Sequence, residues 1–141
     1  MPLPAHLTLE IVTPDRAIAH DQVDEVEIPG ADGYFGVLPG HTPLLASLQV
    51  GEMWYRKAGE RFYLSIAFGF AEVLPDRVTI LAQVAERAEE IDVARAEDEK
   101  RRAEMQLSRR PPSDAELEAA RVSMLKALVR LRVATRKSSR V

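Results

Sequence analysis

Residues Gly33–Leu45 read GYFGVLPGHTPLL, a stretch that holds three glycines and two prolines within thirteen residues. Glycine readily adopts positive φ, whereas proline fixes φ and removes a backbone donor. The stretch can therefore form neither a helix nor a long central strand. Most of its other residues are apolar, as in Tyr34-Phe35 and Leu44-Leu45, although a purely solvated loop would be polar. We therefore predict a chain reversal that packs against the core, with short apolar pieces on either side.

Hydrophobic and polar residues alternate on both sides of this turn, as far as Glu86. Apolar side chains at every second position in residues 7–11 and 26–28 are typical of half-buried strands. The same alternation in the last segment of this half predicts inward-facing residues at Val78, Ile80, Ala82 and Val84. Because Leu81 makes the other face of that segment apolar too, we expect the strand to be covered on both sides.

Turn sequences recur about every 8–12 residues in this half, which is the spacing of a β-sandwich or barrel. One of them, Lys57–Glu60, lies between two apolar and aromatic runs and predicts a hairpin. We therefore predict that residues 1–86 form an antiparallel two-sheet β-sandwich. The acidic residues Asp24, Glu25 and Glu27 are interpreted as a solvated strand edge that deters pairing with another sheet.

Helix-forming residues replace the alternation after Glu86 and dominate from Glu89 to Leu107. Asp92 is a suitable N-cap for this first helix. The pair Pro111-Pro112 breaks the helix, because proline is not tolerated in a helix interior. Large apolar residues are scarce in the first helix, so we expect it to bury little area and to be weakly held.

A second helix is predicted over residues 114–134, directly after the capping box Ser113-Asp114-Ala115-Glu116. Its apolar stripe has helical spacing and consists of Leu117, Ala120, Met124, Leu128 and Leu131, widened by Leu125 and Val129. Residues 87–141 are therefore predicted to form a C-terminal antiparallel two-helix hairpin.

The composition is that of a globular chain, with 141 residues, 46% hydrophobic and 29% charged. There is no cysteine, so disulfides and thiolate zinc sites are excluded. No apolar run approaches the roughly 18 residues of a membrane-spanning helix, and the first ten residues lack the features of a secretory signal. We expect a cytoplasmic protein, unless processing has removed a leader.

Charge is divided unevenly between the two halves. Residues 1–86 carry 5 basic and 12 acidic residues, a net charge of −7. Residues 87–141 carry 14 basic and 10 acidic residues, a net charge of +4. This asymmetry suggests two domains with different partners.

Four segments together resemble the epsilon subunit of the F-type ATP synthase: LEIVTPDR (Leu9–Arg16), PGADGYFGVLPGHTPLL (Pro29–Leu45), FAEVL (Phe70–Leu74) and VTILAQVAERAEEIDVARA (Val78–Ala96). They follow the order and spacing of the family over nearly the whole chain. Two features depart from the family: Phe68 stands where glycine is usual, and Pro111-Pro112 is unusual between the helices. The resemblance implies the same fold and a non-catalytic rotor subunit that needs no cofactor, in a complex coupling ion translocation to ATP synthesis. The sequence does not distinguish proton from sodium coupling.

The resemblance also implies partners for the sandwich. Its end, formed by the turns at residues 32–34 and 39–43, would sit on the polar loops of the membrane c-ring, with contacts from Tyr34 and His41. One face would grip the gamma subunit, and the sequence does not say which. The subunit would be peripheral, on the cytoplasmic face of the bacterial plasma membrane, and would meet the membrane only through the complex.

The second helix carries basic residues at Arg121, Lys126, Arg130 and Arg132. Exposed basic residues on a helix are usually a solvated face. In the family, however, the hairpin can extend along gamma and set this helix against acidic segments of the catalytic alpha/beta subunits, which inhibits ATP hydrolysis. The sequence leaves open whether the hairpin is folded or extended at rest.

The segment IDVARA, Ile91–Ala96, matches the I/L-D-x-x-R-A motif of ATP-binding members of the family. Asp92 and Arg95 are i, i+3 neighbours on one helix face, and arginine offers phosphate a planar fork of donors. The resemblance extends this candidate site for ATP, as a regulatory ligand, to Glu86, Arg102, Lys126 and Arg130. Lysine at 126 keeps the charge but not the bidentate geometry of arginine. The alternative is an ordinary pair that caps and orients the helix.

Recognisable catalytic or metal-binding motifs are absent from the sequence. Its three histidines are scattered, and its Gly-rich turn lacks the Lys-Ser/Thr of a phosphate loop. Two other functions are a stand-alone β-sandwich module whose basic tail contacts an acidic partner or nucleic acid, and a hydrolase. The acidic sandwich would repel nucleic acid, and no recognition motif is present. A hydrolase lacks support because no nucleophile–base pair is recognisable.

Overall fold

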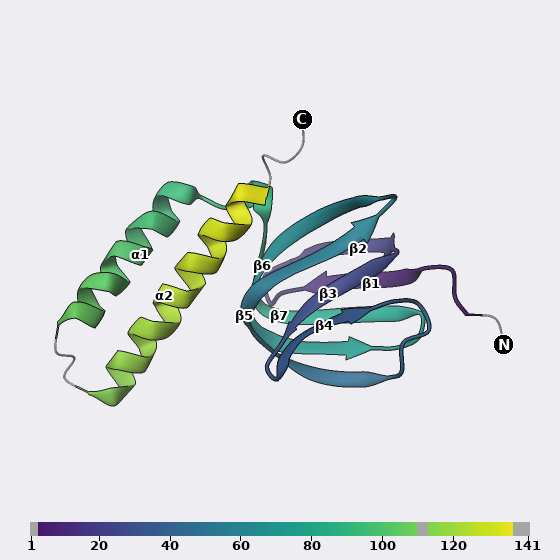
Figure 1. The fold of residues 1–141 in the computed structure, drawn as a ribbon, viewed down its shortest axis with the longest axis horizontal. Coiled ribbons are helices and arrows are strands. Elements are labelled where there is room, and N and C mark those ends of the chain that lie inside the picture. The colour runs from purple at the N-terminus through teal and green to yellow at the C-terminus, as the bar shows by residue number, and fades with distance from the viewer. Residues whose placement is uncertain (1–2, 110–112, 137–141) are drawn as a thin grey trace. The chain divides into compact units, whose positions relative to one another are not determined.

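The structure is a computed structural model that describes residues 3–109 and 113–136. The chain divides into two compact units, with the boundary between Arg87 and Ala88. The first unit is built of strands and the second of helices (Figure 1). The predicted break at Pro111-Pro112 lies outside the described residues.

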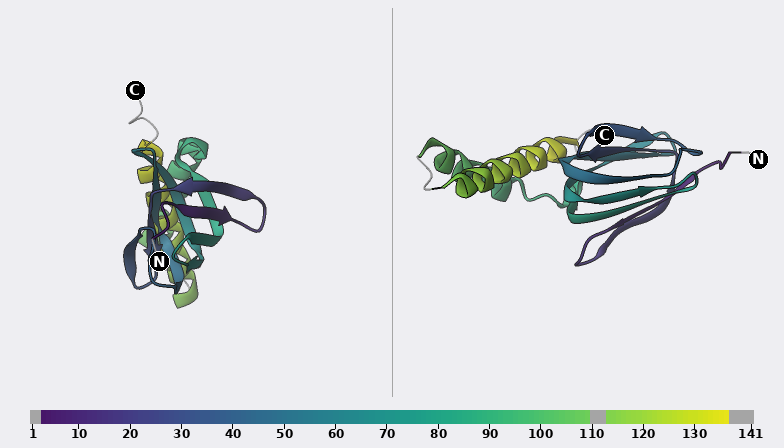
Figure 2. Two further views of the ribbon diagram at one scale, coloured as in Figure 1. Left: turned by 90° about the vertical axis from the view of Figure 1, so that its right-hand side faces the viewer. Right: turned by 90° about the horizontal axis from the view of Figure 1, so that it is seen from below.

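In the described part of the first unit there are seven strands: β1 (Leu7–Val12), β2 (Ala17–Val23), β3 (Glu25–Gly30), β4 (Gly33–Val37), β5 (Leu44–Lys57), β6 (Glu60–Val73) and β7 (Arg77–Arg87). They form one hydrogen-bonded sheet in the order β2-β1-β7-β6-β5-β3-β4. The longest strands, β5 and β6, pair along nearly their whole length from the predicted hairpin turn. The sheet curves over on itself into the two layers of a sandwich, as predicted (Figures 1 and 2).

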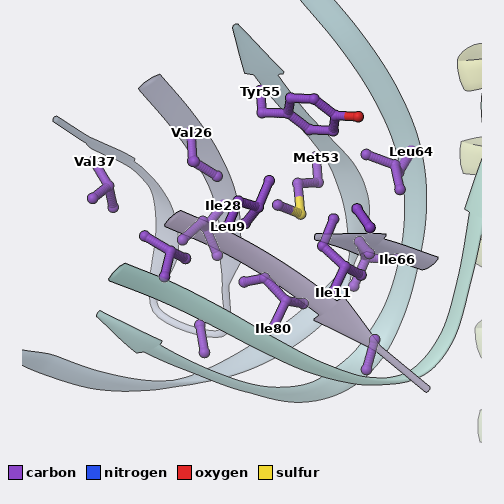
Figure 3. Close-up of a cluster of buried hydrophobic side chains, with 14 of the residues drawn as sticks. Leu9, Ile11, Val26, Ile28, Val37, Met53, Tyr55, Leu64, Ile66 and Ile80 are labelled. Carbon is purple, nitrogen blue, oxygen red and sulfur yellow. The ribbon is translucent and has the colours of Figure 1, made fainter. Parts of the chain in front are cut away.

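The hydrophobic core lies between these layers. The alternation predicted for β1 and β3 is confirmed, because its apolar residues are fully buried: Leu7, Leu9, Ile11, Val26 and Ile28. Met53, Ile66 and Ile80 bring the long strands and β7 into the same cluster (Figure 3). Full burial of one such side chain stabilises a fold by about 1.5–3 kcal/mol, so this cluster accounts for most of the hydrophobic stabilisation of the unit.

The Gly/Pro-rich stretch forms β4 and the reversal into β5, as predicted. The expectation that its apolar residues pack against the core holds for the buried Val37 but is wrong for Leu38 and Leu45, which are 55% and 71% exposed. Gly33 and Gly40 have φ of 135° and 89°, a conformation that glycine adopts readily. The Gly40 amide donates to the Pro75 carbonyl at 2.7 Å, which ties the reversal to the turn between β6 and β7. The reversal is therefore anchored to the body of the sandwich.

One strand pair departs from the antiparallel expectation. β1 pairs with β2 antiparallel but with β7 parallel, and Leu9 lies opposite Val78. β1 and β7 are far apart in the chain, so no tight turn forces them to run in opposite directions. Their relative direction is set by the packing that closes the sandwich.

Two expectations for β7 are wrong. Leu81, expected to be covered, is 53% exposed, and Val84, expected to face inward, is 46% exposed, whereas Ala85 is buried. The alternation shifts by one residue between Ala82 and Ala85. The shift lies opposite the point in β6 where Phe68 and Gly69 have φ of 60° and 124°. These positive φ values break the regular pleat, which sequence periodicity alone does not reveal.

The second unit begins with a single 3-10 turn, η1 (Ala88–Glu90), followed by α1 (Val93–Ser108) and α2 (Asp114–Ala134). The predicted caps are confirmed. The Asp92 carboxylate accepts from the Arg95 amide at 3.1 Å, and the Ser113 hydroxyl accepts from the Glu116 amide at 3.1 Å. Each cap satisfies an amide that the first turn of a helix leaves without a partner.

Small residues recur at heptad spacing on both helices, and we call them the alanine seam: Ala96 and Ala103 on α1, and Ala120, Ala127 and Ala134 on α2. All five are buried. The leucines of the predicted stripe are less buried, and Leu125 and Leu128 are 44% and 38% exposed. Leu128 follows Ala127 directly and so lies about 100° around the helix from it. Alanine buries little apolar area, so the seam holds the hairpin weakly.

Candidate functional site

The IDVARA motif sits at the start of α1, where its two polar residues have separate tasks. The Asp92 carboxylate caps the helix by accepting from the Arg95 amide. The Arg95 guanidinium instead points along the helix, and its Nε donates to Glu99 Oε1 at 3.1 Å. The motif therefore orients α1 and directs an arginine toward Glu99.

Glu99 also receives an arginine from the other helix. Arg130 Nη1 donates to Glu99 Oε2 at 3.1 Å, so each oxygen of this carboxylate binds a different guanidinium. The Arg130 side chain is only 13% exposed, whereas that of Arg95 is 72% exposed. Two predicted site residues, Arg95 and Arg130, are thus brought together through a carboxylate. Sequence reasoning did not single out Glu99, although its i+4 spacing from Arg95 could have suggested the first contact.

Two further predicted residues border an open groove of about 310 Å³ between α1 and α2. Arg102 lies on the α1 side and Lys126 on the α2 side, and Glu99 lines the same groove. Arginine, lysine and a carboxylate therefore meet in one place on the hairpin. Glu86, the remaining candidate ligand, lies on β7 opposite Ser65, in the other compact unit.

Of the four basic residues on α2, two are exposed, Arg121 and Arg132. The other two, Lys126 and Arg130, are half-buried. Arg130 is engaged by Glu99, as described above. In the folded hairpin, the four residues therefore do not present one continuous exposed face.

Tyr34 and His41 border different hollows of the sandwich. The Tyr34 hydroxyl accepts from the Glu52 amide at 3.0 Å, which fixes the ring across the neighbouring strands. His41 Nδ1 lies 2.6 Å from the Thr42 carbonyl oxygen. Since a carbonyl can only accept, Nδ1 is the donor in this contact. Both side chains are held in defined orientations.

The sandwich also exposes apolar side chains that sequence reasoning did not assign to a surface. We call Leu45, Phe70 and Leu81 the outer apolar surface; they are 71%, 54% and 53% exposed. Phe70 lies opposite Leu81 in the β6–β7 pair. A shallow hollow of about 350 Å³ adjoins these two residues and is lined by Val12 and Pro14 among others. Clustered exposed apolar residues commonly mark a protein interface.

Comparison with known proteins identifies the family to which this architecture belongs. Residues 6–88 match the family described as the ATP synthase delta/epsilon chain, beta-sandwich domain. Residues 89–135 match its long alpha-helix domain. The chain belongs to the ATP synthase delta/epsilon chain family. The resemblance read from the four sequence segments is confirmed.

Curated relatives extend over most of the chain. An ATP synthase epsilon chain of Koribacter versatilis is 56% identical over 103 residues, covering 73% of this chain and 72% of the relative. The ATP synthase epsilon chain 2 of Syntrophotalea carbinolica is 46% identical over 130 residues, covering 92% of this chain and 94% of the relative. Both units of the fold therefore lie within the aligned regions of these family members.

Solved structures share the fold at low sequence identity. A chain of the Euglena gracilis mitochondrial ATP synthase, in its OSCP/F1/c-ring part, superposes with a TM-score of 0.72 and 22% identity, covering 99% of this chain and 83% of that one. A chain of the Tetrahymena thermophila mitochondrial ATP synthase central stalk and c-ring superposes with a TM-score of 0.67 and 12% identity, covering 91% of this chain and 96% of that one.

Among the described residues of this family member, none of the helices has the length and apolar character of a membrane span.

Within the described residues, no group of three or more His, Asp or Glu side chains has the arrangement of a metal site. The chemistry that this family member presents consists of cationic side chains on the hairpin and an apolar surface on the sandwich. These features suit binding to proteins and to anions.

Proposed function

We propose that the chain is the epsilon-type rotor subunit of the central stalk of an F-type ATP synthase. In this role it links gamma to the c-ring, so that proton translocation drives ATP synthesis in the catalytic subunits. The observation that carries the proposal is the match of both family domains, in order, to the two units of this fold. The complex would place this peripheral subunit at the cytoplasmic face of the bacterial plasma membrane.

The outer apolar surface is the face that would grip gamma. Leu81 on β7 and Phe70 on β6 are both more than half exposed and lie opposite each other. Burial of such side chains against a partner is favourable by about 25 cal/mol per Å² of apolar area.

The turns that carry Tyr34 and His41 would face the c-ring. The polar loops of the ring need hydrogen-bonding groups, and the His41 imidazole supplies one at the tip of an anchored turn. Rigid turns on a sandwich commonly present contact residues in this way.

The hairpin would be the regulatory element. To extend and inhibit ATP hydrolysis, it has to separate the alanine seam and break the contact between Glu99 and Arg130. Separating the seam exposes little apolar area, because its residues are alanines. Breaking the contact costs more, since the Arg130 side chain is only 13% exposed and both partners are charged. Extension would also release the basic residues Arg121, Lys126, Arg130 and Arg132 for acidic segments of the catalytic subunits.

ATP would be a regulatory ligand of the folded hairpin. Arg95, Arg102, Lys126 and Arg130 supply cations for its phosphates, and Asp92 is an acceptor for its base or sugar. A ligand shifts an equilibrium only by its differential affinity for the two states. ATP would therefore favour the folded hairpin only to the extent that opening moves these groups apart and so lowers the affinity for ATP.

Binding to purified gamma tests whether the outer apolar surface is the face that binds gamma. Leu81→Glu places a charge on the outer apolar surface and should weaken gamma binding at least about tenfold, since an interface core excludes unpaired charge. The matched control is Leu3→Glu, because Leu3 is 74% exposed and lies outside that surface. Equal affinities of both variants and the unaltered chain would contradict the assignment of this face.

A further inference from the structure

The cationic pair at the centre of the candidate nucleotide site is already occupied by an anion of the chain itself. Glu99 is 33% exposed, and its two carboxylate oxygens each accept from one arginine, Arg95 and Arg130. Contacts of this kind, in which donor and acceptor are both charged, are among the stronger hydrogen bonds in proteins. The Arg130 contact joins the second helix to the first, whereas the Arg95 contact lies within the first helix.

We propose that Glu99 is the resident anion of this site, which holds the hairpin folded without nucleotide and competes with phosphate for Arg95 and Arg130. The inference rests on the proposed nucleotide site and adds how that site is regulated. Glu99 holds Nε of Arg95 and Nη1 of Arg130. A phosphate group that takes these donors does so by displacing Glu99.

The groove next to Glu99 shows where a displacing phosphate would gain its advantage. Arg102 and Lys126 line it beside the carboxylate. A triphosphate carries several negative charges and can meet all four cations, whereas Glu99 carries one charge and contacts two of them. Nucleotide therefore displaces Glu99 only at high concentration. When nucleotide is scarce, the contacts of Glu99 keep the hairpin folded.

Calorimetric titration of the full chain with ATP, and separately with inorganic tripolyphosphate, tests the competition. Glu99→Gln keeps the size of the side chain and removes its charge. It should bind both ligands about tenfold more tightly than the unaltered chain, because the two arginines become available to phosphate. Equal affinity in the variant and the unaltered chain would overturn the inference while leaving the nucleotide site in place.

The matched control is Glu97→Gln, which makes the same charge change two residues away on α1. Residues two apart point to different sides of a helix, so Glu97 does not share the position of Glu99. It is exposed. An increase in affinity as large in Glu97→Gln as in Glu99→Gln would reduce the effect to net charge and overturn the inference.

Hydrogen exchange of the α1 amides in the ligand-free chain gives a second, independent measurement. Glu99→Gln should exchange about threefold to tenfold faster than Glu97→Gln, because the carboxylate no longer bridges the helices. If no variant binds either ligand, the proposed nucleotide site fails, and this comparison alone decides the inference. Faster exchange in Glu99→Gln would then support Glu99 as the resident anion, and equal exchange would overturn it.

Discussion

Gly69 has φ of 124°, and a Cβ atom added to it would overlap the Leu81 carbonyl oxygen of the adjacent strand. The close approach of β6 to β7 at this point therefore depends on the absence of a side chain. Its neighbour Phe68 has φ of 60°, which strains a residue of this size. The usual glycine of the family at this position would carry no such strain.

Gly69→Ala should lower the free energy of unfolding of the sandwich by about 3 kcal/mol, since it adds both backbone strain and a clash with backbone. Urea unfolding followed by fluorescence of Trp54, the single tryptophan, measures this. Gly36→Ala is the control, because a Cβ there meets nothing within 4 Å. A midpoint for Gly69→Ala as high as that for Gly36→Ala would contradict this account of the β6–β7 contact.

The contact between Asp21 and Lys57 leads to a prediction for the pKa of Asp21. Lys57 Nζ donates to both of its carboxylate oxygens, at 2.8 and 2.7 Å, and this hydrogen bond is the main reason that the pKa of Asp21 is lowered. A lowered pKa in the folded state stabilises the fold above the pKa of the unfolded chain. The contribution is lost as the pH falls through the folded pKa. Lys57→Met should therefore raise the pKa of Asp21, as followed by NMR titration of its carboxyl carbon. An unchanged pKa would exclude Lys57 as the cause.

At the scale of elements, the sequence predicted those features that depend on local pattern. Strict alternation identified the buried faces of β1 and β3, and helix caps at Asp92 and Ser113 followed from short-range spacing. The exposure of Leu81 was not predictable in this way, because an apolar residue gives the same sequence pattern whether its face of the strand is buried or exposed. Nor was the contact of Glu99 with Arg130, which joins residues 31 apart and depends on how the two helices pack.

The alanine seam leads to a prediction for the hairpin. Ala127→Leu adds a large side chain where Ala127 has no exposed surface, so it should force α1 and α2 apart and cost about 1–3 kcal/mol of hairpin stability. Hydrogen exchange of the α1 amides reports this opening. Ala94→Leu is the control, since Ala94 is exposed on the same hairpin. Equal protection in both variants would mean that the seam does not set the helix spacing.

At the scale of the whole molecule, the two units have different stability and different charge. The sandwich has an extensive fully buried core, whereas the buried residues of the second unit are mostly alanines, with Ile91, Val129 and Val133. An ion pair between Glu99 and Arg130 joins its two described helices. Regions with few buried apolar contacts open more readily than a core does. This contrast suits a subunit in which one unit is a fixed coupling element and the other changes conformation.

The most direct test of the account is ATP hydrolysis by a complex of catalytic alpha and beta subunits with gamma, reconstituted with the full chain or with a chain ending at Arg87. The account predicts that the shortened chain still binds gamma, because the sandwich is a compact unit by itself. It also predicts that hydrolysis is several-fold faster with the shortened chain, because the inhibitory hairpin is missing. Equal rates with both chains, at equal occupancy of gamma, would contradict the assignment of the hairpin as the regulatory element.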